Sequence, residues 1–240
     1  MHKVKRAIIM AAGKGDRMHP VTFDIPKPLV SVNGRRMIDT VIGGLKNNGI
    51  DDIVIVTGYL GEKFEVLKEE YPGIVIVNNP LYDTCNNISS LYFAREYLDT
   101  DVIILDADQM IYNDEILDPG FEKSGYNAVR VQGFTDEWLM QVEDGKVISC
   151  SRNGGENGWQ LYSISRWSLE DAKILRRDIE TEFEKNMNRN IYWDDIPMFV
   201  HFDDFSLGIR EMKKEDIVEI DSFEELVSAD PSYQNYPQAM

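Results

Sequence analysis

Hydrophobic residues in the first half of the chain gather in short continuous runs separated by amphipathic stretches. Runs rich in Val and Ile occupy residues 7–11, 52–59, 74–79 and 101–109. Runs of this length and composition are typical of strands buried on both faces of a parallel sheet. Helical patterns follow the last three runs, at residues 63–70, 88–98 and 115–123. The sequence therefore predicts a doubly wound, mostly parallel α/β sheet with helices on both faces.

From residue 126 the pattern changes to that of antiparallel strands. Strand-like stretches cover 128–133, 138–143, 147–151 and 159–165. Ser168 then opens a helical pattern, in which apolar residues recur at helical spacing from Leu169 to Phe183. We expect this part to form a lid of hairpins and a helix.

No linker separates the two patterns, so we predict one domain over residues 1–240. It would comprise a first half at 1–125, a second portion at 126–215, and a returning strand and helix at 216–228. The tail from residue 231 is expected either to be frayed or to form an oligomer contact, for which a homodimer is one option.

A loop rich in glycine, proline and basic residues follows the first predicted strand. Gly13 and Gly15 allow the backbone to approach a ligand with its N–H groups exposed. Arg17 can grip phosphate oxygens, and Lys27 stands between two prolines that restrict the backbone around it. The loop matches neither the dinucleotide fingerprint nor the G-x-x-x-x-G-K-[ST] phosphate loop. It indicates an anion site, and the alternative is a glycine-rich surface turn.

Charge and composition limit the classes of partner that the protein can bind. The chain has 25 basic and 42 acidic residues and a net charge of −17, which argues against nucleic acid or an anionic membrane surface as a partner. No apolar stretch is long enough to span a bilayer. Two cysteines are too few for a disulfide framework, which fits a cytoplasmic protein. Lys14, Arg17 and Lys27 supply a local cation cluster for an anionic substrate.

The loop as a whole resembles the G-x-G-x-R…P-K-P-L signature of the sugar-phosphate and alcohol-phosphate nucleotidyltransferases. The residues in register are Gly13, Gly15, Arg17, Pro20, Pro26, Lys27, Pro28, Leu29 and Gly34. The resemblance implies a Rossmann-like fold of the nucleotide-diphospho-sugar transferase type, in which residues 1–125 form the nucleotide-binding half and residues 126–215 the acceptor-binding portion. It also implies catalytic roles for Lys14, Arg17 and Lys27, and nucleotide contacts from Ala11, Ala12, Gly13, Gly15, Gly58 and Tyr59.

The same resemblance implies a magnesium site built from distant carboxylates. Asp108 aligns with the aspartate of the family's G-D dipeptide, and Asp106 lies beside it at the end of a buried run. Residues 218–226 resemble the family's closing I-D-T-P-E-D-L segment, which makes Asp221 the second ligand and Glu219 its substitute. Carboxylates that cap the following loop or helix are the alternative at each position.

Residues 86–91 resemble a segment of the bacterial phosphocholine cytidylyltransferases, N-N-I-x-S-L. Asn side chains offer both donors and acceptors, so Asn86 and Asn87 are predicted to contact the cytosine of CTP. Ser89, in the same segment, is predicted to contact the nucleotide. Either Asn could instead cap a helix.

Aromatic and acidic residues concentrate in the second half. A quaternary ammonium is held by aromatic faces and nearby negative charge, so we predict an acceptor site formed by Trp159, Tyr192, Trp193, Asp194 and Asp195. The alternative is that these rings belong to the hydrophobic core.

The combined resemblance implies a Mg²⁺-dependent enzyme that transfers CMP from CTP to phosphocholine, giving CDP-choline and pyrophosphate. Three acceptors remain as alternatives: 2-aminoethylphosphonate, phosphoethanolamine and a sugar 1-phosphate. A non-catalytic nucleotide sensor is the alternative of a different class.

Overall fold

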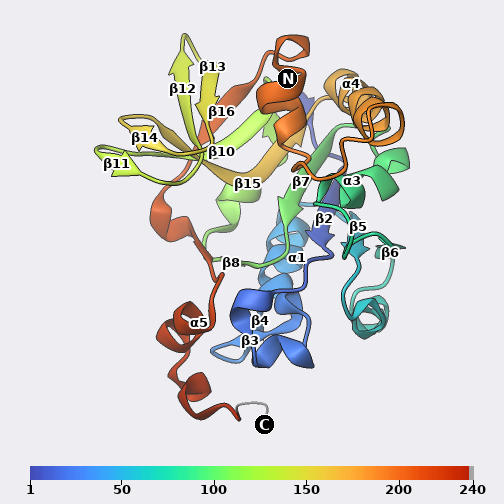
Figure 1. The fold of residues 1–240 in the computed structure, drawn as a ribbon, viewed down its shortest axis with the longest axis vertical. Coiled ribbons are helices and arrows are strands. Elements are labelled where there is room, and N and C mark those ends of the chain that lie inside the picture. The colour runs from blue at the N-terminus through green and yellow to red at the C-terminus, as the bar shows by residue number, and fades with distance from the viewer. Residues whose placement is uncertain (238–240) are drawn as a thin grey trace.

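The computed structural model describes residues 1–237 and contains a nine-stranded central sheet (Figure 1). Its strands are β2 Arg6–Ala11, β5 Asp52–Thr57, β6 Val75–Asn78, β7 Val102–Asp106, β10 Gly125–Arg130, β12 Leu139–Glu143, β13 Lys146–Ser151, β15 Trp159–Trp167 and β16 Gly208–Glu211. Seven of them follow the order β13-β12-β15-β7-β2-β5-β6, while β10 pairs with β15 and β16.

Strand β2 lies in the centre of the parallel part of this sheet. Ile9 pairs with Ile55 of β5 on one side and with Leu105 of β7 on the other, and all three side chains are buried. Apolar side chains on both faces explain why these runs lack polar alternation. The predicted doubly wound α/β fold is confirmed. Strand β6 departs from the prediction of full burial, because it lies at the sheet edge and leaves Val75 exposed.

Helices cover both faces of the sheet, as predicted. They are α1 Met37–Asn47, α2 Val66–Glu70, α3 Ile88–Phe93 and α4 Leu169–Glu180. A fifth helix, α5 Phe223–Ala229, packs away from the central sheet, with Leu226 in a separate buried cluster that includes Met18 and Val30. Leu45 of α1 and Leu67 of α2 share one buried cluster with Ile9. Leu91 of α3 and Leu175 of α4 share another with Ile8. Successive side chains of β2 therefore pack into the two hydrophobic clusters on opposite faces of the sheet.

One predicted helix does not form, and two are shorter than expected. Residues 114–117 form a 3-10 turn, after which β9 Gly120–Phe121 pairs with β1 His2–Lys3. Pro119 lacks an N–H group and disfavours helical backbone in the residue before it, which explains the break. The segments at 63–70 and 88–98 are each part α-helix and part 3-10 helix.

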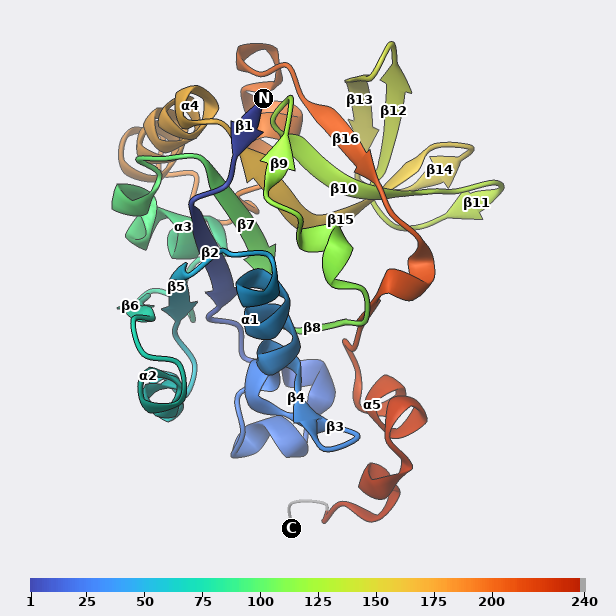
Figure 2. The same cartoon turned by 180° about the vertical axis from the view of Figure 1, so that it is seen from behind.

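The second half joins the same sheet through β15. Ile164 of β15 pairs antiparallel with Leu105 of β7, and β15 also pairs with β10 and β12. The predicted hairpin strands and the helix after Ser168 are present. The short pair β11 Phe134–Thr135 and β14 Gly155–Glu156 projects beyond the sheet (Figure 2).

The C-terminal segment returns to the first half. Strand β17 Ile217–Glu219 pairs antiparallel with β8 Gln109–Ile111, and α5 follows at the opposite end of the molecule from α4 (Figure 1). Another two-stranded sheet joins β3 Ser31–Val32 to β4 Arg35–Arg36. Residues 238–240 of the tail that we considered for a dimer contact lie outside the described residues. Among residues 1–237, every helix is too short or too polar to cross a bilayer.

Candidate active site

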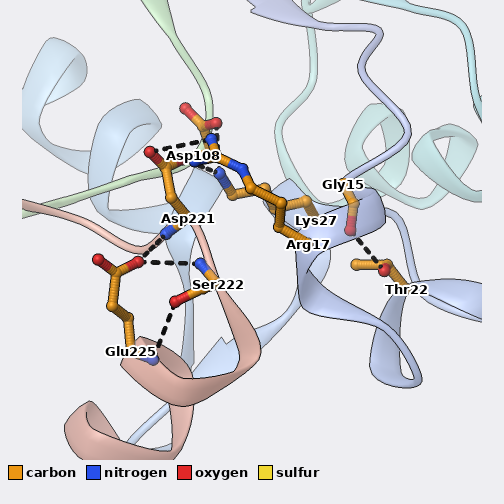
Figure 3. A network of polar contacts seen from close by, with 8 residues as sticks. All are labelled: Gly15, Arg17, Thr22, Lys27, Asp108, Asp221, Ser222 and Glu225. Carbon is orange, nitrogen blue, oxygen red and sulfur yellow. Dashed lines mark hydrogen bonds and ion pairs between the residues drawn. The ribbon is translucent and has the colours of Figure 1, made fainter.

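Lys27 lies at the centre of an ion cluster beyond the carboxyl ends of the parallel strands (Figure 3). Its Nζ is 2.7 Å from Oδ2 of Asp108 and 2.6 Å from Oδ1 of Asp221. Arg17 reaches the other oxygen of Asp221, with Nη2 3.2 Å from Oδ2. The prediction that distant parts of the chain converge here holds for these four side chains, which come from the glycine loop, the turn after β7 and the turn after β17.

Burial and charge pairing act in opposite directions on this cluster. Burial disfavours the ammonium of Lys27, but Asp108 and Asp221 more than offset it, so the pKa of Lys27 is raised. Burial likewise disfavours ionised Asp221, yet Lys27 and Arg17 hold the pKa of its carboxyl below the usual value. Both partners are therefore charged near neutral pH.

A capping box at the start of α5 fixes the backbone of Asp221. The backbone N–H groups of Asp221 and Ser222 donate to Oε2 of Glu225, at 2.7 and 2.9 Å. The Ser222 hydroxyl accepts from the N–H of Glu225 at 3.2 Å (Figure 3). This confirms the predicted helix start and shows that capping and a carboxylate at the site occur together.

The glycine loop forms one wall of a cleft of about 350 Å³ next to the cluster. The cleft is lined by Met10, Ala11, Gly13, Gly15, Asp16, Arg17, Lys27, Pro28, Asp108 and Asp221. Gly15 has a φ of 67°, and an added Cβ would lie 3.1 Å from side-chain atoms of Lys27 and Thr22. Thr22 Oγ1 donates to the Gly15 carbonyl at 2.8 Å, which holds this turn against the lysine.

Gly58 and Tyr59 support this loop from the neighbouring strand. An added Cβ on Gly58 would lie 2.6 Å from Cβ of Tyr82 and 2.9 Å from the Ala12 carbonyl oxygen, so only glycine fits. The Tyr59 N–H donates to the same carbonyl at 3.2 Å, and the Tyr59 hydroxyl donates to the Thr22 carbonyl at 2.9 Å. Both residues hold the loop in place, as does the Ala12 carbonyl.

Lys14 does not line the cleft. Its ammonium forms an ion pair with Asp83, and its side chain is 40% exposed at the rim. Asp83 raises the pKa of Lys14 through this contact. Nothing in the sequence pattern identified Asp83 as its partner.

A second cavity of about 270 Å³ adjoins the first, and Asp221 lines both. Its other lining residues are Asn87, Asp106, Glu137, Trp138, Leu161, Ser163, Tyr192, Asp194 and Glu219. Of the predicted acceptor residues, Tyr192 and Asp194 are therefore at this cavity. Glu137, Trp138 and Ser163 also line the cavity but were not predicted to do so. Of the three, only Trp138 could have been found from the sequence, because it belongs to the group of aromatic residues in the second half.

Carboxylates make the second cavity strongly acidic. Burial raises the pKa of Asp106 well above its usual range, and the charges of Asp108 and Asp194 add to this. Burial also raises the pKa of Asp194 to about 7. Solvent still reaches Glu219 at the rim, where surrounding protein atoms and the charges of Asp108 and Asp221 raise its pKa to about 8. Such mutual repulsion would be relieved by a cation.

Trp193, Asp195 and Trp159 do not join this cavity, which corrects the predicted aromatic cage. Trp193 is 3% exposed and packs edge-to-face on Trp167 in the core. Asp195 is buried and accepts from Arg152 at 2.8 Å. Trp159 lies at the start of β15 under the guanidinium of Arg130.

The polar side chains at the start of α3 make hydrogen bonds within the protein. Oδ1 of Asn87 accepts from the Trp193 N–H at 2.8 Å, while Nδ2 of Asn86 donates to the Asn190 carbonyl at 3.5 Å. Neither side chain caps the helix. Ser89 is fully buried, with its hydroxyl bonded to Asn79 and Asn86, so it cannot contact a nucleotide in either cavity.

Comparison with known proteins assigns the family. The nucleotidyl transferase profile matches residues 6–118. The 2-aminoethylphosphonate cytidylyltransferase of Lancefieldella rimae is 38% identical over 95% of this chain and 92% of its own length. The chain belongs to the nucleotidyl transferase family. The choline-phosphate cytidylyltransferase of Streptococcus pneumoniae is 32% identical over 92% of this chain and 94% of its own length.

The fold of this nucleotidyltransferase agrees with that assignment. The solved structure of the CTP:phosphocholine cytidylyltransferase from Streptococcus pneumoniae superimposes with a TM-score of 0.85 and 31% identity, covering 96% of this chain and 99% of that one. The glycine loop and Asp108 lie within the segment matched by the family profile, whereas Asp221 lies beyond it.

The carboxylates beside Lys27 fit a hard divalent cation, the kind of metal that nucleotidyltransferases generally use. Oxygens of Asp108 and Asp221 already converge on a single positive atom, the Lys27 ammonium. All donors are carboxylate oxygens, the ligand type that Mg²⁺ prefers. Asp106 lines the second cavity. Of the three predicted ligands, Asp108 and Asp221 are therefore the two whose oxygens converge on Lys27, and the ligand set stays a prediction.

Proposed function

We propose that this nucleotidyltransferase transfers the cytidylyl group of CTP to a small phosphate or phosphonate that carries an amine, releasing pyrophosphate. The observation that carries the proposal is the pair of adjoining cavities with different charged linings. One has the glycine loop and the cations Arg17 and Lys27 together with the carboxylates of Asp16, Asp108 and Asp221, which suits a triphosphate that brings a divalent metal. The other is acidic and suits a cationic amine. Similarity to cytidylyltransferases over nearly the whole chain supports CTP as the donor.

The basic residues would hold the reacting phosphates in line. An ionised oxygen of the acceptor attacks the α-phosphorus, and pyrophosphate leaves from the opposite side, so no general base is required. Lys27, whose partner Asp221 lines both cavities, would contact the acceptor phosphate, while Arg17 would stabilise charge on the nucleotide. Lys14 would reach the departing pyrophosphate on releasing Asp83. Mg²⁺ held by Asp108 and Asp221 would neutralise phosphate charge.

The acceptor cavity supports 2-aminoethylphosphonate as the preferred substrate. A primary ammonium has three N–H donors and needs acceptors, and four carboxylates besides Asp221 line this cavity. Only two aromatic rings join them. Trp138 and Tyr192 meet edge-to-face, at 89° and 6.0 Å between ring centroids, and do not form parallel walls for a trimethylammonium group.

Phosphocholine is the second candidate. The faces of Trp138 and Tyr192 and the charge of Asp194 supply the elements that hold a quaternary ammonium. The fold shared with a phosphocholine enzyme favours it as well. Phosphoethanolamine carries the same primary ammonium as 2-aminoethylphosphonate, and the relative of 38% identity, named for the phosphonate, favours the latter. The acidic lining disfavours sugar 1-phosphates, which have no cationic group.

A substrate screen tests the proposal. Pyrophosphate release is measured with each of four nucleoside triphosphates against 2-aminoethylphosphonate, phosphocholine, phosphoethanolamine and glucose 1-phosphate, with Mg²⁺ present. We expect the highest kcat/KM for CTP with 2-aminoethylphosphonate. A higher value for phosphocholine would select the second candidate. No release with any pair would overturn the catalytic proposal and favour a nucleotide sensor.

A further inference from the structure

We propose that Asp178, His201 and Asp204 form a second metal site, for a divalent transition metal of the zinc class. One ligand atom from each of these side chains lies within 4.8 Å of the other two. The site lies where α4 meets the segment 196–204, at the end of the molecule opposite the loop around β3 and β4 (Figures 1 and 2). It is therefore separate from the carboxylates beside Lys27.

Asp178 supplies a buried oxygen that lacks a partner. The side chain is 2% exposed, and Oδ1 accepts from Nε of Arg177 at 2.7 Å. Oδ2 is buried and has no hydrogen-bond partner among the described residues. A buried carboxylate oxygen without a partner is costly. A bound cation would satisfy it.

His201 is oriented as metal-binding histidines are. Its Nε2 lies 3.0 Å from Oε1 of Glu182, and Asn186 and Asn188 also donate to that carboxylate, at 2.8 and 3.2 Å. With Nε2 as the donor to this carboxylate, the Nδ1 lone pair is free to bind a metal. Nδ1 faces Asp204, 4.0 Å from Oδ2. A carboxylate behind the histidine is the usual support for a metal ligand.

In the metal-free structure, the guanidinium of Arg177 supplies positive charge to this cluster. It would compete with a metal for the carboxylates of Asp178 and Asp204. It forms ion pairs with Asp178, at 2.7 Å, and with Asp204. Its side chain is 58% exposed, so it can turn into solvent without breaking core packing. Its single charge faces two carboxylates, those of Asp178 and Asp204. A divalent ion would balance this local charge better than Arg177 does.

The ligand types select the metal class. One imidazole nitrogen with two carboxylate oxygens suits Zn²⁺ and related ions, whereas Mg²⁺ favours oxygen-only sites that keep several waters. A metal here would join α4 to the segment that follows Tyr192 and Asp194. We therefore expect it to stabilise the acceptor side of the fold.

Zinc titration of the metal-free protein by calorimetry, with thermal melts in parallel, tests the proposal. We expect one saturable Zn²⁺ site that Mg²⁺ does not occupy. At hundredfold excess over Kd, the melting temperature should rise by about 5 °C or more. His201→Gln and Asp204→Asn should each weaken binding at least about tenfold, the lower range for disturbed metal sites. Asp203→Asn, a change at a neighbouring exposed carboxylate, is the matched control and should bind as the parent does.

Arg177→Gln separates a metal site from a simple ion-pair network. If Arg177 competes with the metal, its removal should tighten Zn²⁺ binding. Unchanged or weaker binding in Arg177→Gln would overturn the assigned competition and the site with it. Zinc binding that survives both His201→Gln and Asp204→Asn would place the ion elsewhere and refute the site. Absence of saturable binding to the parent protein would refute it directly. Circular dichroism of each variant verifies that the fold is intact.

Discussion

Asp194→Asn should stabilise the ligand-free protein at alkaline pH. In the folded protein, burial raises the pKa of Asp194 to about 7, from 3.8. The folded state therefore binds more protons than the unfolded state between these values, and stability must fall as pH rises through this range. The two pKa values differ by about 3, and each pKa unit corresponds to about 1.4 kcal/mol, so the ionised carboxyl costs at most about 4 kcal/mol at pH 8. Asp194 is only half-buried, and solvent screening reduces this upper limit.

The asparagine variant removes this cost while keeping the local hydrogen bond. Oδ1 of Asp194 accepts from the Tyr126 hydroxyl at 2.9 Å, and an amide oxygen can do the same. Thermal melts of parent and variant should coincide at pH 4. They should diverge by up to about 10 °C at pH 8, since 1 kcal/mol corresponds to about 2–4 °C in a domain of this size. The difference between parent and variant removes the contribution of other titrating groups.

An acceptor with an ammonium group would explain why the destabilising carboxyl of Asp194 is present, because the ammonium would pair with its charge. The same variant should then raise KM for the amine-bearing acceptor and leave KM for CTP nearly unchanged. Asp203→Asn, at an exposed carboxylate outside both cavities, serves as the control. If Asp194→Asn melts with the same pH dependence as the parent, the carboxyl is not held in its neutral form and the electrostatic reasoning is wrong.

Three further outcomes follow from the cluster around Lys27 and from the acceptor cavity. Asp108→Asn should lower kcat by about 10² to 10³, typical for a positioned electrostatic group, with little change in CTP affinity; near-parental turnover at saturating Mg²⁺ would contradict it. Lys27→Met should abolish most activity. It should also lower the melting temperature, because Asp108 and Asp221 lose their shared partner. Added Mg²⁺ should restore the melting temperature but not turnover. Tyr192→Leu should raise KM for phosphocholine by about 2- to 30-fold, from a cation–π energy of about 0.5–2 kcal/mol, and change KM for 2-aminoethylphosphonate less; equal effects would remove Tyr192 from amine discrimination.

The sequence allowed the sheet and the ion cluster to be predicted because strand ends can be located from the apolar runs. Parallel strands place their carboxyl ends at one edge, so Asp108 after β7 and the glycine loop after β2 had to be neighbours. The capping pattern of Ser222 and Glu225 placed Asp221 at the end of the returning strand. Its contact with Lys27, 194 residues earlier in the chain, could be inferred only from the resemblance to the family's closing segment.

The acceptor cavity could not be predicted in the same way, because composition does not determine which way a side chain points. Tyr192 and Trp193 are adjacent and both aromatic, yet the first is 49% exposed and the second 3%. Asp194 and Asp195 likewise differ, since the first lines the cavity and the second pairs with Arg152. Glu137 reaches the cavity from a turn between β11 and β12, where no pattern marked it.

The shared position of Asp221 explains why the chain must return to the first half to complete the site. Residues 6–118 contain the strands, the glycine loop and Asp108, but they provide only one of the two carboxylates that contact Lys27. The second arrives through β17, which β8 holds in register by pairing Glu219 with Gln109. Because Asp221 also lines the acceptor cavity, its placement by the α5 capping box sets the wall between the two cavities. Fixing that wall by backbone hydrogen bonds gives both substrates a common reference point, which in-line transfer between them requires.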